Sequence, residues 1–261
     1  MPILARCLRA AARSYREGSI VTIKRGFAKG LRWQRCHRYV NGYWLGIYEL
    51  PLQRAIAEFL RDGDVFYDVG ANAGFFTILA AKRVGPSGMV YAFEPHPFNA
   101  MTVRTQVEVN AFKNCEVISA AVGAKDGVCD LIDKGELSTC HVGGVSESNE
   151  MWHSQRVALT SLDSFSTEHR PPDVIKIDVE GAEFELLRGA QRLLSRKPNP
   201  RIACEVHGDN WLTVCRTLLD ARYLLFDLTG SPVQLDNPTR FVIAVAEKGY
   251  QFSNSTKANG V

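Results

Sequence analysis

Five acids and one histidine stand where predicted β-strands end, and side chains of these types can bind a ligand and move a proton. They are Asp68, Glu94, Asp178, Glu180, Glu205 and His207. Parallel strands of an open α/β sheet bind ligands just beyond their carboxyl ends, so these side chains are expected to share one rim. There a carboxylate can accept hydrogen bonds from hydroxyl groups, and a carboxylate or an imidazole can act as a general base.

A glycine turn follows the first of these strands. The run Val65–Val69 is apolar or aromatic apart from one acid, as in a strand covered on both faces, and Gly70 and Gly74 come after it. Glycines let the chain turn sharply and let a ligand approach closely, and the next helix points free N–H groups at that ligand. Glu94 ends the second strand, twenty residues after Gly74, where an acid can accept both hydroxyls of a ribose. This pattern predicts a nucleoside cofactor.

The same turn favours S-adenosylmethionine (SAM) over a dinucleotide. A dinucleotide site has the spacing G-x-G-x-x-G, whose middle glycine makes room for a pyrophosphate, whereas this chain has Gly70-x-x-x-Gly74. Asp68 would repel a pyrophosphate but suits a cation, and SAM carries a sulfonium and an ammonium and has no phosphate. We therefore assign Glu94 to the ribose, and Asp68, Gly70, Asn72 and Gly74 to the methionine portion.

If the protein uses SAM to methylate an acceptor molecule, it mainly has to align the acceptor oxygen with the methyl group of SAM. When the acceptor is an alcohol, a base is also needed to remove its proton. Asp178 is the first candidate for the base, because it ends the fourth strand opposite the cofactor turn. His207 is the second candidate, since an ordinary histidine pKa of about 6.5 suits a base at neutral pH. Glu180 and Glu205 could orient the acceptor or tune the base, and Lys176 could pair with one of the acids.

Plainer roles stay open for several of these residues. Asp178 can cap the helix that begins at Gly181, and His207 can simply be a turn residue. Lys176 can be a structural ion-pair partner, and Glu183 fits the surface of a helix.

A metal site is a further alternative at the same rim. Asp178, Glu180, Glu205 and His207 are oxygen and nitrogen ligands that could gather around Mg²⁺ or a similar ion. Such an ion would lower the pKa of the acceptor hydroxyl. We expect a site without a metal, in which a side chain alone serves as the base.

Motifs spread along the chain resemble the FkbM-type family of SAM-dependent methyltransferases. In order they are Asp68–Thr77 (DVGANAGFFT), Phe93–Pro95 (FEP), Ala120–Gly123 (AAVG), Ser161–Asp163 (SLD) and Lys176–Glu183 (KIDVEGAE). The last motif is the most specific, and the resemblance covers roughly residues 44–246. It implies methylation of hydroxyl groups on sugars, polyketides or other natural products, and it does not fix the acceptor.

The resemblance also implies roles for residues that spacing alone does not single out. Ala121 is expected beside the adenine, and Glu49 is expected to approach the cofactor. The motifs add Ala71, Phe75 and Pro95 to the cofactor-binding residues, and Glu183 belongs to the family pattern.

Strands and helices alternate along the chain as in a doubly wound sheet. The expected strands are 65–69, 89–93, 115–121, 173–178, 200–206, 223–228 and 240–246, and the expected helices are 48–61, 73–84, 97–110, 181–195 and 209–221. A hairpin pair, 128–133 with 156–160, flanks a polar stretch, 135–154, interpreted as a loop and a lid over the acceptor. The predicted fold is α/β: a Rossmann-like sheet of about seven strands, mostly parallel with an antiparallel C-terminal edge hairpin, as in class I methyltransferases.

Charge is concentrated at the N-terminus. Residues 1–40 hold ten Lys or Arg and one acid, although the net charge of the whole chain is only +3. Leu4, Leu8, Ala11, Ala12 and Tyr15 recur at helical spacing, which predicts a basic amphipathic helix. That helix can pack on the domain, contact a membrane surface or contact nucleic acid. We expect a basic helical extension at 1–43, a methyltransferase domain at 44–248 and a disordered tail at 249–261.

Cysteine usage and hydropathy indicate a cytoplasmic protein. The seven cysteines include no C-x-x-C pair, so neither a disulfide framework nor a zinc site is expected. No run approaches the roughly 20 apolar residues of a membrane span, and the early arginines do not suit a secretory signal.

Rival functions fit parts of the sequence. Methyltransferases acting on base amines usually carry an Asn/Asp-Pro-Pro-aromatic motif after the fourth strand, but this chain has Asp178-Val-Glu-Gly181 there. An NAD-dependent oxidoreductase needs a different glycine spacing. A non-catalytic module that binds SAM or a glycan stays open as the alternative. The expected partner is a small-molecule or glycan hydroxyl acceptor and no nucleic acid.

Overall fold

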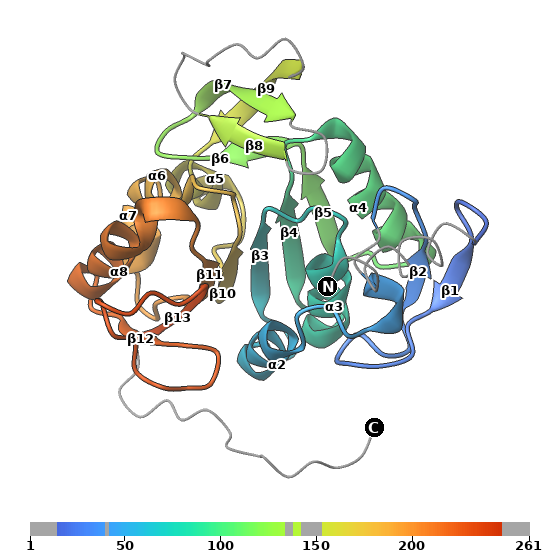
Figure 1. Ribbon diagram of the computed structural model, residues 1–261, viewed down its shortest axis with the longest axis horizontal. Coiled ribbons are helices and arrows are strands. Elements are labelled where there is room, and N and C mark those ends of the chain that lie inside the picture. Colours follow the sequence, from blue (N-terminus) through green and yellow to red (C-terminus); the bar gives the residue numbers. More distant parts are fainter. Residues whose placement is uncertain (1–14, 40–41, 134–137, 142–152, 247–261) are drawn as a thin grey trace.

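A computed structural model describes residues 15–39, 42–133, 138–141 and 153–246 of the chain (Figure 1). Its centre is a seven-stranded sheet with the strand order β12-β13-β11-β10-β3-β4-β5. The strands are β3 Val65–Val69, β4 Met89–Phe93, β5 Cys115–Ile118, β10 Val174–Ile177, β11 Arg201–Glu205, β12 Leu224–Phe226 and β13 Phe241–Val245. Six of them run in one direction, and β13, which lies between β12 and β11, is antiparallel to both of these neighbours. The predicted fold class is confirmed.

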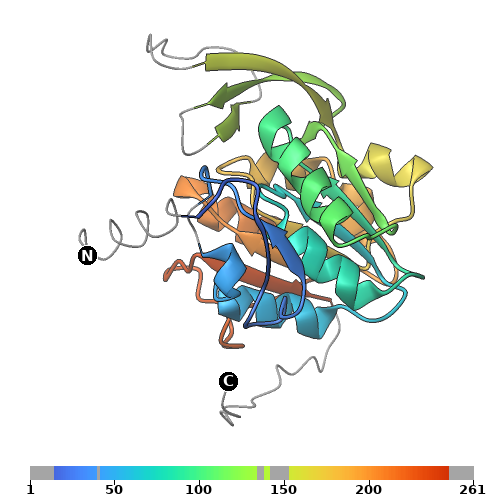
Figure 2. The same ribbon diagram turned by 90° about the vertical axis from the view of Figure 1, so that its right-hand side faces the viewer.

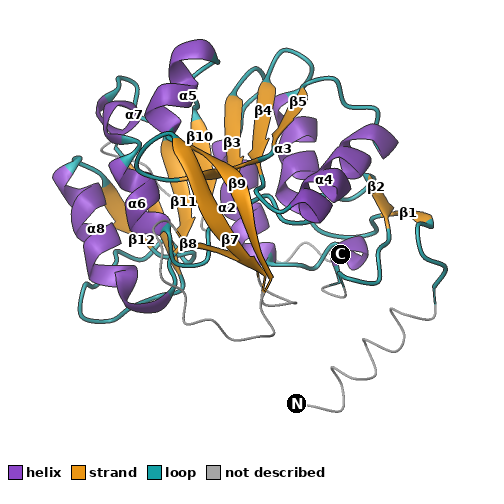
Figure 3. Ribbon diagram, turned by 90° about the horizontal axis from the view of Figure 1, so that it is seen from above, coloured by secondary structure: helices purple, strands orange, loops and turns teal. Residues whose placement is uncertain are grey.

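Helices cover both faces of this sheet (Figure 3). One face carries α2 Leu50–Phe59, α3 Phe75–Val84 and α4 Pro97–Val109, and the other carries α5 Leu162–Glu168, α6 Glu183–Arg188, α7 Gln191–Ser195 and α8 Trp211–Asp220. Successive residues of a strand point to opposite faces, so Phe66 packs in one core with Ile78 while Tyr67 packs in the other with Phe165. Burial on both faces explains why the strands are continuous apolar runs.

The expected helix over 181–195 is two helices, α6 and α7. They are separated at Gly189, whose carbonyl accepts a hydrogen bond from the N–H of Asp163 at 2.8 Å. A Cβ at Gly189 would lie 2.0 Å from the carbonyl oxygen of Gly123, so only glycine permits this close approach. The helical periodicity of the sequence continues across the break, and it could not reveal a contact with a distant segment.

A second, four-stranded sheet lies beyond the carboxyl ends of β3 and β4 (Figures 1 and 2). It consists of β6 Ala120–Val122, β7 Gly127–Asp133, β8 Ser138–His141 and β9 His153–Thr160, in the order β6-β9-β7-β8. The predicted hairpin pair is confirmed, since β7 and β9 are antiparallel. The expected strand over 115–121 is instead two strands, β5 and β6, in different sheets. Within the expected loop at 135–154, β8 is a strand, and residues 135–137 and 142–152 lie outside the described residues.

The N-terminal region differs from the expected helical extension. Strands β1 Ile20–Thr22 and β2 Arg32–Gln34 form an antiparallel hairpin, followed by the short 3₁₀ helix η1 Tyr43–Leu45. Trp33 is only 2% exposed and belongs to the same core as α2 and α3. The hairpin therefore packs on the core that α2 and α3 share. The amphipathic helix was predicted from positions 4–15, of which all but Tyr15 lie outside the described residues.

In the described part of the chain, none of the helices is long and apolar enough to cross a bilayer.

Gly70 joins the two long sequence motifs in space. Its φ is 77°, and a Cβ there would lie 1.8 Å from the backbone oxygen of Asp178.

We expect Gly70→Ala to lower the free energy of unfolding by at least about 2 kcal/mol, because both the dihedral and the contact oppose a side chain. Denaturant unfolding measures this change. Gly30→Ala is the matched control, since Gly30 has a φ of 89° but no atom near its Cβ. Equal losses in the two variants would remove the contact as the cause.

Candidate active site

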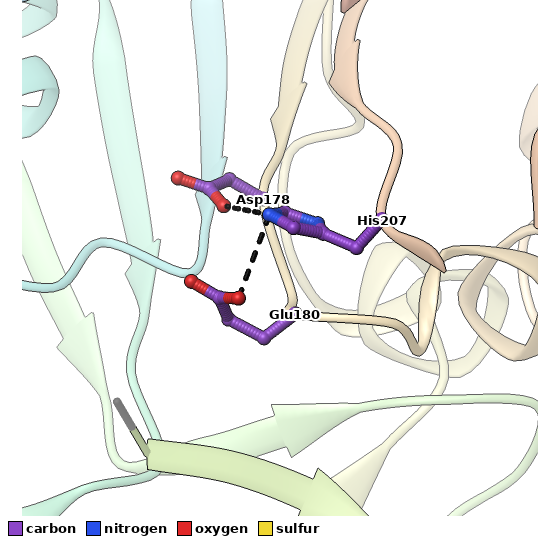
Figure 4. Close-up of side chains that lie close together, drawn as sticks. All are labelled: Asp178, Glu180 and His207. Atoms are coloured by element: carbon purple, nitrogen blue, oxygen red, sulfur yellow. Dashed lines mark ion pairs between the residues drawn. The ribbon is translucent and has the colours of Figure 1, made fainter. Parts of the chain in front are cut away.

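The strand ends bring the predicted catalytic side chains together around His207 (Figure 4). Asp178 follows β10, Glu205 ends β11, and Glu180 lies in the turn after β10. The Nε2 atom of His207 is 3.2 Å from Glu205 Oε1, 3.5 Å from Glu180 Oε2 and 4.0 Å from Asp178 Oδ1. The side chains of Asp178, Glu180 and His207 are 20%, 34% and 24% exposed, so a ligand at the rim can reach them.

The second ring nitrogen of His207 contacts a residue that sequence reasoning placed wrongly. Its Nδ1 lies 2.8 Å from Glu183 Oε1, and Glu183 is fully buried. The expectation that Glu183 lies on a helix surface is therefore wrong. It failed because the first turn of α6 packs against the segment after β11, which helical periodicity does not record. Membership of the family motif was the one signal that pointed to this residue.

His207 is charged at neutral pH in this arrangement. Hydrogen bonds with Glu183 and Glu205 outweigh the effect of burial and raise the pKa of His207 to about 10. A protonated imidazole has no free lone pair with which to accept a proton. The argument for His207 as second candidate base used its ordinary pKa, and these neighbours remove that argument.

Lys176 lies between the glycine turn and the acidic rim. Its ammonium is 3.4 Å from Asp68 Oδ1 and 3.4 Å from Asp178 Oδ2, and it donates a 2.8 Å hydrogen bond to the carbonyl of Gly70. Burial lowers the pKa of Lys176, but the carboxylates of Asp178 and Asp68 raise it by more. The pKa of Lys176 is therefore above its ordinary value. Lys176 is therefore a permanent cation that ties together the ends of β3 and β10.

Burial raises the pKa of Asp178 above its ordinary value, although Lys176 opposes that shift. A carboxylate with a raised pKa is a stronger base than an exposed aspartate. Asp178 is thus partly exposed, forms an ion pair with Lys176 and is more basic than an ordinary aspartate. These are the properties required of the first candidate base.

Asp68 lies behind the glycine turn. It is fully buried, accepts a 2.6 Å hydrogen bond from the hydroxyl of Thr77 and has its other oxygen near Lys176. Its Oδ1 has no hydrogen-bond partner among the described residues, and the assignment of Asp68 to the methionine portion of SAM stays a prediction. Thr77 was not singled out from the sequence, although it ends the same motif.

Glu94 is held in place at the end of β4 by backbone and side-chain donors. The N–H of Asn72 donates to its Oε2 at 2.7 Å, and the N–H of His96 donates to its Oε1 at 2.9 Å. Asn99 adds a third contact through Nδ2 at 3.3 Å, and the hydroxyl of Tyr39 donates to the Oδ1 of Asn99. Burial raises the pKa of Glu94 to about 7, and these hydrogen bonds limit the rise.

The other predicted cofactor residues lie in the turn itself, at the start of α3, after β4 and in β6. Ala71 is 6% exposed, and the left-handed φ values of Asn72 and Gly74 are 49° and 86°. The side chain of Phe75 packs in the core against Tyr43 and Tyr48. Pro95 directly follows Glu94 and precedes α4, whose first residue is Pro97. Ala121 is 5% exposed and lies in β6, next to Leu159 of β9.

Glu49 carries an unsatisfied buried oxygen on the other side of the rim. Its Oε1 is 3.0 Å from Nη2 of Arg240, whose Nε is 2.5 Å from Glu205, but its Oε2 has no hydrogen-bond partner among the described residues. Burial and the charge of Glu205 raise the pKa of Glu49 to about 7. An orphaned polar atom of this kind indicates a missing partner such as a ligand. Arg240 was not singled out from the sequence, where it begins the expected strand 240–246, and in the structure it directly precedes β13.

Asp178, Glu180 and His207 also offer metal-type ligand atoms within 4.8 Å of one another. Metal binding requires a neutral imidazole, whereas the neighbours of His207 hold its proton. We therefore do not assign these residues to a metal, and the expectation of a metal-free site stays a prediction.

The sheet with its antiparallel edge, the glycine turn after β3 and the buried acid after β4 define a SAM-dependent methyltransferase of the class I fold. The Methyltransferase FkbM domain matches residues 68–230, and the chain belongs to this family. The family assignment from the sequence motifs is thereby confirmed.

Two relatives of similar sequence are named as methyltransferases. Methyltransferase 1 of Beauveria bassiana is 26% identical over 147 residues, which are 49% of this chain and 59% of the relative. The hexuronic acid methyltransferase AglP of Haloferax volcanii is 27% identical over 151 residues, which are 56% of this chain and 58% of the relative. The chain thus spans about three fifths of the length of each.

Solved structures with a similar fold include a methyltransferase FkbM from Methylobacillus flagellatus, with a TM-score of 0.46 and 15% identity over 80% of this chain and 53% of that one. A SAM-dependent O-methyltransferase from Thermotoga maritima has a TM-score of 0.45 and 12% identity over 93% of this chain and 83% of that one.

Proposed function

We propose that this protein transfers a methyl group from SAM to a hydroxyl group of a sugar, glycan or other natural product, with Asp178 as the base. The observation that carries the proposal is the placement of Asp178. Its carboxylate is partly exposed at the rim, 3.4 Å from Lys176, and the backbone oxygen of Asp178 approaches the glycine turn at Gly70. Base and cofactor turn are therefore neighbours.

The residues at the turn fit SAM in charge and in hydrogen bonding. Glu94 keeps free lone pairs for the ribose hydroxyls beside its backbone donors. Asn72 and Gly74, with the backbone of Gly70 and Ala71, are assigned to the methionine portion, and Ala121 to the adenine. The orphaned Oε2 of Glu49 is a suitable partner for an ammonium group. Carboxylates outnumber cations at this edge, which suits a cationic cofactor and would repel a pyrophosphate.

The chemistry asked of the protein is small. Bound SAM supplies a methyl group on a sulfonium, so the C–O bond to the acceptor forms as the C–S bond breaks and its electron pair stays on sulfur. The acceptor proton passes to the carboxylate of Asp178, whose raised pKa favours the transfer. We assign Glu180 and Glu205, which pair with His207 and Arg240, to orienting hydroxyl groups of the acceptor.

The first test is calorimetric titration with SAM, S-adenosylhomocysteine (SAH) and NAD. We expect micromolar binding of SAM and SAH and none of NAD. Methyl transfer is then measured on a panel of hydroxylated sugars and natural products. Glucuronic acid glycosides come first, because the Haloferax volcanii relative is a hexuronic acid methyltransferase. Folded protein that binds neither SAM nor SAH would refute the proposal.

A non-catalytic module that binds SAM or a glycan is the second candidate. Its signature would be SAM binding without turnover on any acceptor and with no effect of changes at Asp178. The predicted cytoplasmic location and the domain bounds stay predictions.

Chelation tests the expectation of a metal-free site. We expect methyl transfer to change less than about twofold after exhaustive treatment with EDTA, because an aspartate alone serves as the base. Added Mg²⁺ should likewise leave SAH binding unchanged. Loss of activity that Mg²⁺ restores would show that the rim binds a metal.

A further inference from the structure

Glu183 is a buried acid for which the proposed chemistry has no direct use. It is the first residue of α6, is fully buried and cannot touch a ligand. Buried carboxylates are costly unless they are paired, so its position requires an explanation. Its contacts with other side chains include one ionisable group, the ring of His207.

Both oxygens of Glu183 are held by donors from two segments. Its Oε1 accepts a 2.9 Å hydrogen bond from the N–H of Gly181, and its Oε2 accepts one of 3.1 Å from Nδ2 of Asn210. Asn210 also donates to the carbonyl of Gly181 at 2.7 Å. The carboxylate therefore has one orientation, and the ring nitrogen Nδ1 of His207 lies 2.8 Å from its Oε1.

This contact determines what the opposite ring nitrogen faces. With Nδ1 bound inside the protein, Nε2 of His207 points to the rim, within 4.0 Å of carboxylates from Asp178, Glu180 and Glu205. These acids come from β11 and from the turn after β10. Figure 4 shows the side chains of Asp178 and Glu180 converging on the ring.

We propose that Glu183 is a positioning residue, which fixes the ring of His207 so that Nε2 gathers the carboxylates of Asp178, Glu180 and Glu205 at the rim. The inference rests on the proposed function only where it calls this rim the acceptor site. In this arrangement His207 is a charged organiser of the carboxylates, and Asp178 alone takes the acceptor proton.

Charge balance supports this assignment. The acids facing His207 are Asp178, Glu180, Glu183 and Glu205, while the other nearby cations, Lys176 and Arg240, are bound to Asp178 and Glu205. Within the part of the chain that the structure describes, Glu180 forms an ion pair with no cation other than His207. A neutral ring would leave neighbouring carboxylates to repel one another. The hydrogen bond with Glu183 is the largest cause of the raised pKa of His207.

The test is a pH titration of the histidine rings by NMR in wild-type protein and in Glu183→Gln. The chain has six histidines, and His207→Gln assigns the resonance of interest. In wild-type protein the ring of His207 should stay charged up to pH of about 10. In Glu183→Gln it should titrate closer to the ordinary value of about 6.5.

Glu185→Gln is the matched control. Glu185 lies on the same helix, and its change removes the same charge, but its side chain is 36% exposed and pairs with Arg188. It should leave the titration of His207 unchanged. A Glu183→Gln variant that folds and titrates like wild-type protein would overturn the proposal. If that variant does not fold, the wild-type titration decides, since a His207 ring that is neutral at pH of about 8 would also overturn it.

SAH titration separates this inference from the proposed function. Glu183 does not touch the glycine turn, so Glu183→Gln should bind SAH within about threefold of wild-type affinity. Absent SAH binding in wild-type protein would refute the methyltransferase proposal, while the histidine titration would still decide the role of Glu183.

Discussion

Replacing Asp178 by Asn is expected to lower kcat for methyl transfer by about 10²–10⁴-fold, the usual contribution of a positioned general base. The amide keeps the shape of the side chain but cannot accept the acceptor proton. It also removes one of the two carboxylates that bind Lys176, but Asp68 and the carbonyl of Gly70 still hold that ammonium. The glycine turn should therefore keep its form, and the affinity for SAH should change by less than about threefold.

The measurement pairs steady-state methyl transfer on the identified acceptor with calorimetric titration of SAH. Asp209→Asn is the matched control, because Asp209 is exposed in the short helix η2 Gly208–Asn210, close in sequence to His207. It should leave both kcat and SAH affinity unchanged. An Asp178→Asn enzyme with near-normal kcat would exclude this carboxylate as the base and would favour Glu180, the other partly exposed acid at the rim.

The parts of the fold that the sequence predicted best are those in which local pattern and tertiary burial agree. Strands β3 and β4 have the expected bounds, because each is a short apolar run with both faces buried and a glycine turn or an acid at its end. The hairpin β1–β2 was missed, because its strands are only three residues long and its buried residues, Ile23, Leu31 and Trp33, stand among basic side chains. Strand β6 was merged with β5, because only Ser119 separates the two strands, although they belong to different sheets.

In the candidate site, too, the sequence could place some residues and not others. Acids at strand ends could be placed on one rim from topology alone, and the structure puts Asp178, Glu180 and Glu205 around His207. The partners that set their charge could not be placed, because they come from helix turns and connections. Glu183 belongs to α6, and Arg240 precedes β13. Without those partners an ordinary pKa for His207 was a reasonable assumption, and its base role followed from it.

Replacing Glu94 by Gln is expected to weaken SAH binding by about 10- to 100-fold. Hydrogen bonds to a charged group contribute about 1.5–3 kcal/mol each, and tenfold in affinity corresponds to about 1.4 kcal/mol. The amide also replaces one acceptor oxygen by an NH₂ group, which would face the N–H of either Asn72 or His96. Glu116→Gln is the control, since Glu116 is an exposed acid on the neighbouring strand β5.

The pH dependence of SAH binding isolates the charge of Glu94. Its pKa is raised to about 7 in the free protein, so the carboxyl takes up a proton as the pH falls through that value. A protonated carboxyl accepts fewer hydrogen bonds, and wild-type affinity should therefore fall from pH of about 8 to about 6. Glu49 also has a pKa of about 7, so only the part of this dependence that disappears in Glu94→Gln belongs to Glu94. Calorimetry of both proteins at these two pH values makes the comparison, and an unchanged pH dependence in the variant would mean that the ribose is bound elsewhere.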